Sequence, residues 1–297
     1  MVGLLAGAAV FAAYRLPPPT TSDLDQVLEG ARALLHGQDP YGSAERAHFF
    51  FPQLYPLTAL LLLAPLAPLP TELARVGWAV AGGAALAIAA RRYGRGLPAA
   101  LLSASFLNAV ILGQWSPFLT ASAVLPVLGV AWAAKPSIGA AMFAAFPSRR
   151  GVMAALLLLV LSLVVSPSWP WRWWGVLFHG PQAIPILRPA GFLLLLALLR
   201  WRRPEARLLV ALGCVPQTIG LYDTLPLFLI PRTRMQGYGL AVMSYLAAFG
   251  QALFYPRLPD MTLAQNLTER WPVVLVCLYL PALFLVLRHP NADEAEQ

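Results

Sequence analysis

Charged side chains are scarce in this chain. Only 11% of its 297 residues are Asp, Glu, Lys or Arg, whereas 59% are hydrophobic. An ordinary soluble domain has roughly 25% charged residues. Long apolar runs recur from residue 1 to residue 287, so the apolar excess belongs to segments that enter or cross a membrane and not to one large core. This composition excludes a water-soluble globule.

Cysteine and lysine are also scarce. Cys214 and Cys277 lie in apolar stretches without Cys-x-x-Cys or metal-ligand spacing, so neither a disulfide framework nor a zinc site is expected. The basic residues comprise one lysine, Lys135, and arginines scattered in twos and threes at segment ends. The net charge of +8 is therefore a topology signal, and nucleic acid is not an expected partner. The sequence contains no P-loop, dinucleotide fingerprint or HExxH motif, so no cofactor is expected, and any need for a metal stays open.

Short breaks that carry arginine or proline separate the apolar segments. The segments cover about 1–16, 54–69, 73–90, 97–112, 117–134, 137–147, 151–165, 183–200, 208–231, 236–255 and 272–287. Several are too short to span alone, because a helix rises about 1.5 Å per residue and the hydrocarbon core is about 30 Å thick. The pattern predicts an all-α, polytopic bundle with roughly 8–10 spans, including short or re-entrant helices, in one integral-membrane domain over residues 1–297.

Arginine clusters indicate which segment ends face the cytoplasm. They lie at 91–95, 149–150, 200–207, 232–234 and 288. The positive-inside rule then places the loop 17–53 outside and the polar tail 289–297 inside. The number of membrane crossings agrees with these positions only if 54–69 and 208–231 do not each cross fully. If 54–69 does span, the first arginine cluster lies outside instead. Residues 1–16 are expected to be a first span and not a signal peptide, since they lack a basic leading region.

The loop 17–53 concentrates negative charge. Five of the thirteen carboxylates lie there, at Asp23, Asp25, Glu29, Asp39 and Glu45. A serine three residues before Asp25 resembles a capping box, and apolar residues follow it at helical spacing. We therefore expect an amphipathic helix on the membrane surface, with Asp23 and Asp25 at its water boundary. Its apolar stripe comprises Leu24, Val27, Leu28, Ala31, Leu34 and Leu35. The plainer interpretation is that these acids only stabilise the helix dipole.

Two ionisable residues, Lys135 and Asp223, lie within apolar sequence. Charge inside a membrane is costly, so such residues are usually functional or paired. The plainer alternatives are that Lys135 ends a helix at the cytoplasmic face before Pro136, and that Asp223 pairs with an arginine such as Arg188. Gln114, in a turn between two short segments, either contacts a substrate or caps the turn. The tryptophan-rich stretch at 169–174 is more typical of an interfacial aromatic belt than of a sugar-stacking site.

The first loop carries a pattern that resembles a known family. Asp23 is followed, after thirteen residues, by Gly-Gln-Asp-Pro-Tyr at 37–41. This resembles the D…G-x-D-P-Y loop of GT-C membrane glycosyltransferases, in particular the polyprenol-phosphate-mannose-dependent mannosyltransferases of glycosyltransferase family 87. Later stretches agree in order: Phe-Pro-Gln-Leu-Tyr-Pro-Leu at 51–57, which includes Tyr55; Asn108 with Gly-Gln-Trp-Ser at 113–116; Lys-Pro at 135–136; and Pro216 with Tyr222 and Asp223.

The resemblance implies a hexosyltransferase. It would move a mannose-like sugar, with inversion, from a polyprenyl-phosphate donor to a hydroxyl on a lipid or glycan acceptor. The reaction would take place outside a plasma membrane, and the preference for arginine over lysine indicates a bacterial one. Asp23 takes the place of the family's loop aspartate and is the expected general base, with Asp25 second. The groups expected to hold the donor phosphate or sugar are Lys135, Gln114, Asp223, Tyr222, Asn108 and Tyr55.

One functional alternative from another class remains. Broken helices around Lys135 and Asp223 are also compatible with a non-enzymatic transporter or lipid flippase. A transporter of that kind commonly has an inverted repeat that places such residues at corresponding positions of two halves. The sequence shows no such repeat. The chain departs from the glycosyltransferase pattern at Ser116, where that family favours Asn, and this leaves the donor sugar open.

Overall fold

The computed structural model describes residues 1–15, 22–42, 49, 52–177, 182–254 and 269–289. Within these ranges the regular secondary structure is all helical, apart from one isolated bridge between Ala183 and Gln217. The predicted loop 17–53 is described only in part. The predicted tail 289–297 lies outside the described residues except for its first one.

The helices follow one another along the chain with short breaks. The first half contains α1 (Val2–Arg15), α2 (Asp23–Leu35), η1 (Pro40–Gly42), α4 (Leu57–Leu63), η2 (Ala64–Leu66), α5 (Thr71–Tyr93), η3 (Leu97–Leu102), α6 (Ala104–Ile111), α7 (Ser116–Ser122), η4 (Pro126–Gly129), α8 (Val130–Ala134) and α9 (Pro136–Ala145). The second half contains α10 (Arg149–Val165), α11 (Trp169–Leu177), η5 (Pro185–Leu187), η6 (Gly191–Arg200), α12 (Pro204–Cys214), η7 (Leu221–Leu229), α13 (Arg234–Phe254), α15 (Trp271–Val274), η8 (Leu275–Tyr279) and α16 (Leu280–Leu287).

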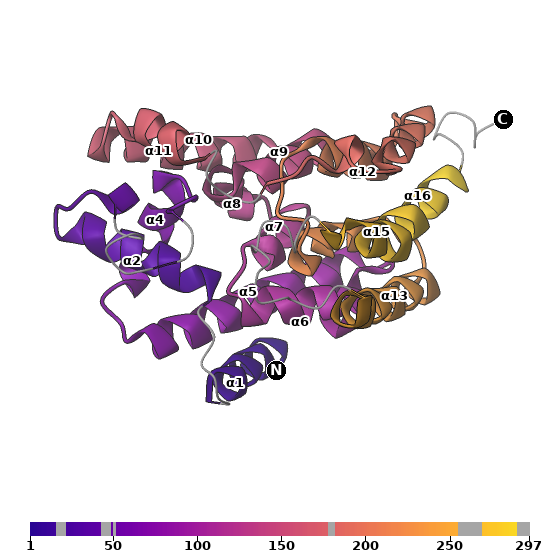
Figure 1. Cartoon of the computed structure of the whole chain (residues 1–297), viewed down its shortest axis with the longest axis horizontal. Coiled ribbons are helices and arrows are strands. Elements are labelled where there is room, and N and C mark those ends of the chain that lie inside the picture. The colour runs from indigo at the N-terminus through magenta and orange to yellow at the C-terminus, as the bar shows by residue number, and fades with distance from the viewer. Residues whose placement is uncertain (16–21, 43–48, 50–51, 178–181, 255–268, 290–297) are drawn as a thin grey trace.

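Helices α5, α9, α10 and α12 run roughly along the long axis of the molecule (Figure 1). In this view α11, α10, α9 and α12 line one side, α1 lies on the opposite side against α5, and α2 with α4 occupies one end. Two helices, α5 and α13, are long and apolar enough to cross a membrane. The pair α10 and α11, bent by 102° at its break, adds a third candidate if it forms one span.

The described residues confirm an all-helical protein with candidate membrane-spanning helices. They do not confirm a bundle of 8–10 spans, because most of the apolar segments are divided into helices shorter than a membrane is thick. Proline explains several of these breaks, since its ring clashes with a continuing helix. Pro136 separates α8 from α9, for example, and Pro56 and Pro204 precede or open α4 and α12.

The amphipathic helix predicted in the first loop is present as α2. Ser22 caps it: its hydroxyl accepts a hydrogen bond from the Leu24 amide at 3.2 Å, while the Asp25 carboxylate accepts one from the Ser22 amide at 2.8 Å. This is the capping box expected from the sequence. The stripe that begins at Leu24 is buried through Ala31, and it packs against α4, η2 and α5. Leu35, at the end of the helix, is exposed.

Two arginine contacts hold α2 in place. Arg75, near the start of α5, makes a two-pronged ion pair with Asp25, in which its Nε lies 2.6 Å from Oδ1. Arg32 donates to the Ala67 carbonyl at 2.9 Å and to the Thr71 hydroxyl at 3.0 Å. The two ends of α2 are therefore fixed to the start of α5 and to the segment just before it.

Candidate functional site

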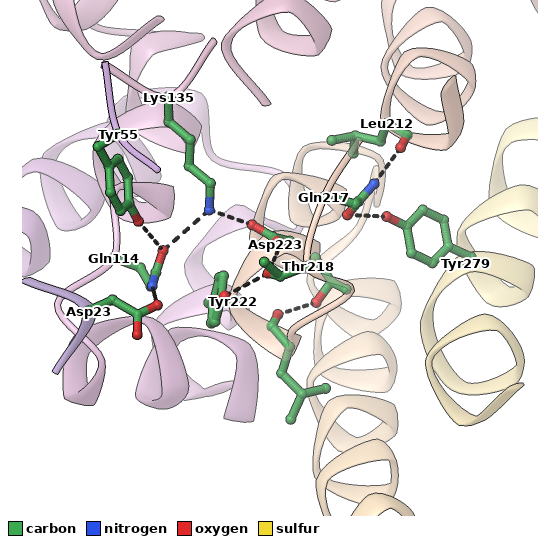
Figure 2. Close-up of polar contacts among 12 residues, drawn as sticks. Asp23, Tyr55, Gln114, Lys135, Leu212, Gln217, Thr218, Tyr222, Asp223 and Tyr279 are labelled. Atoms are coloured by element: carbon green, nitrogen blue, oxygen red, sulfur yellow. Dashed lines mark hydrogen bonds and ion pairs between the residues drawn. The ribbon is translucent and has the colours of Figure 1, made fainter. Parts of the chain in front are cut away.

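Six of the eight side chains predicted to be functional lie in one polar network (Figure 2). They are Asp23, Tyr55, Gln114, Lys135, Tyr222 and Asp223. Each stands at or beside an interruption of a helix: the start of α2, the segment before α4, the turn between α6 and α7, the break between α8 and α9, and the start of η7. Broken helices inside a membrane protein commonly form binding sites because they free polar groups for a ligand.

Gln114 is placed by the turn that ends α6. The Gly113 amide bonds to the Val110 carbonyl at 3.2 Å, and the Gln114 amide bonds to the Ala109 carbonyl at 2.8 Å. With Gly113 at a φ of +64°, this is a Schellman motif, which favours glycine at the left-handed position. A Cβ at Gly113 would lie 2.5 Å from Cβ of Leu24. Glycine thus lets the turn approach the start of α2 and brings Gln114 to Asp23.

Lys135 is placed by the proline that follows it. Proline disfavours helical conformation in the preceding residue, and Lys135 adopts φ −132° and ψ 79° between α8 and α9. Its ammonium lies 2.7 Å from Oδ1 of Asp223 and 3.2 Å from Oε1 of Gln114. It also lies 4.8 Å from the centre of the Tyr222 ring, whose face attracts a cation. The side chain is 13% exposed, so the only lysine is paired inside the protein.

Asp223 is fully buried in the first turn of η7. Its partner is Lys135 and not Arg188, the structural partner considered from the sequence. Its second oxygen accepts a hydrogen bond from the Thr218 hydroxyl at 2.9 Å, and that hydroxyl also lies 2.6 Å from the Tyr222 hydroxyl. Thr218 was missed from the sequence, where its only signal is a polar Gln-Thr pair within the apolar segment 208–231.

The loop that carries Thr218 is held rigidly. Its neighbour Gln217 forms the backbone bridge with Ala183, donates from its side chain to the Leu212 carbonyl at 2.5 Å, and accepts from the Tyr279 hydroxyl at 3.2 Å. Ile219, which is buried, has a φ of +56°. A β-branched residue rarely adopts this conformation, which costs roughly 1–3 kcal/mol. The packing around the loop therefore imposes the strained backbone that presents Thr218 to Asp223.

Asp23 opens α2 and is partly buried. Its carboxylate accepts a hydrogen bond from Nε2 of Gln114. Burial raises the pKa of Asp23 to about 6, against the opposing effects of the Lys135 charge and the Gln114 hydrogen bond. The group is consequently ionised at neutral pH but only weakly stabilised in that form. A carboxylate of this kind suits general-base catalysis, which is most effective when the pKa lies near the working pH.

Two predicted residues lie outside the network. Asp25 is engaged with Arg75, which makes it an anchor for α2. Nothing in its sequence neighbourhood identified Arg75 as its partner. Asn108 lies on α6 before the Gly113 turn, and its side chain does not join the network within the described part of the chain.

The tryptophans at 169–174 divide into two groups. Trp169 is buried, and Trp173 donates from its indole to the Leu54 carbonyl at 2.8 Å. Trp171 is 80% exposed, and Trp174 is exposed as well. Exposed indoles on a helix bent away from an apolar one are typical of the belt at a membrane interface. Trp173, which is partly buried, instead supports the segment that carries Tyr55, whereas the Trp169 indole donates to the Ser162 hydroxyl of α10 at 3.0 Å.

Replacing Asp25 with Ala is expected to destabilise the protein without removing any network residue. The change removes the two-pronged ion pair between Asp25 and the largely buried Arg75 guanidinium, and breaking a buried pair typically costs about 3–5 kcal/mol. Thermal unfolding of the purified protein in detergent measures the effect. Glu29→Ala serves as the control, because its ion pair with Arg32 is more exposed and longer, at 3.7 Å. Equal stability of the two variants would contradict the anchoring role.

An apolar groove of about 450 Å³ lies beside the network. Three of its lining residues adjoin the polar site in sequence: Pro56 follows Tyr55, while Ala133 and Pro136 flank the position of Lys135 closely. Trp169 and Trp173 of α11 also line it, together with residues of α8, α9 and α10. The arrangement combines a largely buried cation, a partly buried carboxylate and an apolar groove next to the segments that carry Tyr55 and Lys135. It can therefore accommodate an anionic headgroup attached to a hydrocarbon chain.

The described residues contain no cluster of three or more His, Cys, Asp or Glu side chains suited to a metal ion. Comparison of the chain with family models, with curated proteins and with solved structures finds no match.

Proposed function

We propose that the protein is a membrane glycosyltransferase that uses a polyprenyl-phosphate sugar. The donor carries a hexose, mannose-like, and the acceptor is a hydroxyl on a lipid or glycan. The observation that carries the proposal is the link from Asp23 through Gln114 to the largely buried Lys135, whose neighbours in sequence line an apolar groove. A carboxylate and a cation held near each other provide the two charges that this transfer requires.

The reaction follows from those two charges. Asp23 accepts the proton of the acceptor hydroxyl as its oxygen attacks the anomeric carbon of the sugar. The bond from that carbon to the phosphate oxygen breaks on the opposite face, so the configuration inverts. The departing phosphate gains a negative charge, which Lys135 stabilises. The groove lined by Trp169 and Trp173 holds the prenyl chain.

The membrane arrangement belongs to the same proposal. In it, the short helices combine with α5 and α13 into a multi-pass protein of a bacterial plasma membrane. The arginine clusters face the cytoplasm, in accordance with the positive-inside rule. Helix α2, with its polar start at Asp23, lies in the outer loop, so the site faces the outside. The amphipathic character of α2 and the exposed Trp171 support this placement.

The test is transfer by the purified protein in proteoliposomes. Radiolabelled mannose linked to polyprenyl phosphate is supplied in the lipid, and octyl hexosides are supplied as hydroxyl acceptors. Labelled octyl disaccharide of inverted configuration is the expected product. Donors that carry other hexoses or a pentose, tested in parallel, identify the sugar. Absence of transfer from every donor in a folded, incorporated protein would overturn the proposal.

One observation favours the second candidate, a transporter. Lys135 and the fully buried Asp223 form an ion pair at two helix breaks, an arrangement found at transport sites. A transporter would move the sugar lipid between leaflets without breaking a bond. The same vesicles distinguish the two, since translocated donor becomes accessible to a probe on the other side while the sugar stays attached to its lipid.

A further inference from the structure

The amide of Gln114 has a fixed orientation. Its oxygen accepts hydrogen bonds from the Lys135 ammonium at 3.2 Å and from the Tyr55 hydroxyl at 3.4 Å. An ammonium can only donate, so the amide oxygen must face Lys135 and the amide nitrogen must face away from it. That nitrogen donates to Asp23. The charge on the lysine therefore decides which end of Gln114 the carboxylate meets.

The backbone around Gln114 allows little adjustment. The residue follows the left-handed Gly113 of the Schellman motif, and Gly113 is packed against Leu24 and against Oγ of Ser22. The Gln114 side chain is 2% exposed. Its oxygen has both acceptor positions occupied by protein groups. Little of this amide is left for a sugar or a phosphate, although the sequence suggested that role.

We propose that Gln114 is a positioning residue: it holds the Asp23 carboxylate toward the acceptor and ties the orientation of this base to Lys135. The inference rests on the proposed function and adds a division of labour to it. Lys135 then serves twice, by stabilising the departing phosphate and by orienting the amide that orients the base. Gln114 itself does not contact the donor.

A consequence for pH follows from the groups around Asp23. Those that influence it are Lys135 and Gln114, which favour its ionised form, and Asp223 and Asp25, which disfavour it. Tyr55 faces the same amide, and Arg75 is engaged by Asp25. Removing the Gln114 hydrogen bond leaves burial and the two carboxylates in place. The pKa of Asp23 therefore rises, and the low-pH limb of the activity profile moves to higher pH.

The test compares wild type with Gln114→Met, which keeps the length of the side chain but cannot donate. NMR titration of isotope-labelled aspartate carboxyl carbons follows Asp23 directly, and Asp23→Asn assigns its signal. We expect the Asp23 pKa to rise by about one unit in Gln114→Met, the size of one hydrogen bond to a charged group. Gln251→Met is the matched control, since Gln251 is a buried glutamine outside the network.

A second variant guards against a folding defect. Gly113→Ala keeps Gln114 but pushes the turn away from α2, because its Cβ would collide with Leu24. It is expected to raise the Asp23 pKa in the same direction, with the thermal unfolding profile reporting whether the chain still folds. An unchanged Asp23 titration in folded Gln114→Met overturns the inference.

Kinetics separate this inference from the function on which it rests. In Gln114→Met the low-pH limb of kcat/KM should move upward by the shift seen in the titration, with little change in the donor KM at high pH. A large rise in donor KM with no movement of the limb shows that Gln114 binds the donor, which overturns the inference. Absence of transfer by wild type instead overturns the proposed function, and the NMR titration still reports whether Gln114 controls Asp23.

Discussion

Asp23→Asn is expected to abolish sugar transfer while leaving the protein folded. Asparagine preserves the shape of the side chain and still accepts the hydrogen bond from Gln114, but it cannot take a proton from the acceptor. Loss of a general base typically slows a reaction by about 10²–10⁴-fold. Initial rates in proteoliposomes measure the loss. Glu29→Gln, a change of a carboxylate elsewhere on α2, should keep the wild-type rate.

The same variant should be more stable than wild type at neutral pH. The pKa of Asp23 is raised to about 6 in the folded state, so the folded protein binds this proton more tightly than the unfolded chain does. Ionisation of Asp23 therefore costs stability above pH 6, and the cost vanishes below pH 4. Asn removes it, for a gain of about 1–2 kcal/mol at pH 7 after the lost helix-dipole contact is subtracted.

The stability changes expected at Asp23 and at Asp25, two residues apart, have opposite signs. Asp23→Asn should be inactive and stable, whereas Asp25→Ala should be destabilised.

Wild-type transfer should fall about tenfold for each pH unit below 6, as the base becomes protonated. Full activity in Asp23→Asn would show that another group accepts the proton.

The second large effect is expected at Lys135. Lys135→Met removes the cation that stabilises the departing phosphate, and loss of one such group typically lowers kcat by about 10²–10³-fold. The substitution also leaves Asp223 buried without a counter-charge, which alone destabilises by about 3–5 kcal/mol. Activity loss in this single variant therefore combines a chemical cause with a structural one.

The double variant Lys135→Met/Asp223→Asn separates the two causes. The asparagine side chain that replaces Asp223 would be neutral and could still accept from Thr218, so the fold should recover much of its stability. Transfer should stay low, because no cation returns. Lys135→Arg should restore only part of the rate, since a planar guanidinium does not reproduce the compact ammonium above Tyr222. A stable double variant with wild-type kcat would remove Lys135 from the mechanism.

Local patterns predicted the elements that local physics determines. The capping box at Ser22, the buried stripe of α2 and the short helices at prolines follow from side chains near in sequence. The ordered resemblance to the glycosyltransferase loops also selected residues that the fold brings together, from Asp23 to Asp223. The partner of Asp25 and the role of Thr218 could not be predicted, because each depends on contacts between segments distant in sequence.

The secondary structure of some apolar stretches could not be predicted from the sequence either. Residues 191–200 form a 3-10 helix, η6, although their composition suits an α-helix just as well. Packing against α12 and α16 accompanies this choice, and no single residue in the stretch signals it. The number of membrane crossings depends on such breaks, which is why it could not be obtained from the apolar segments alone.

The strained loop at Ile219 has an implication for how such a site could diversify. A backbone pinned on several sides and held in a rare conformation tolerates few substitutions, since most of them release the strain and move Thr218. Helix α2, on the other side of the network, is a regular α-helix that begins with a capping box, so its backbone carries no comparable strain. A change of acceptor, by evolution or by engineering, should therefore be easier through substitutions in α2 than through substitutions in the loop that carries Thr218 and Ile219.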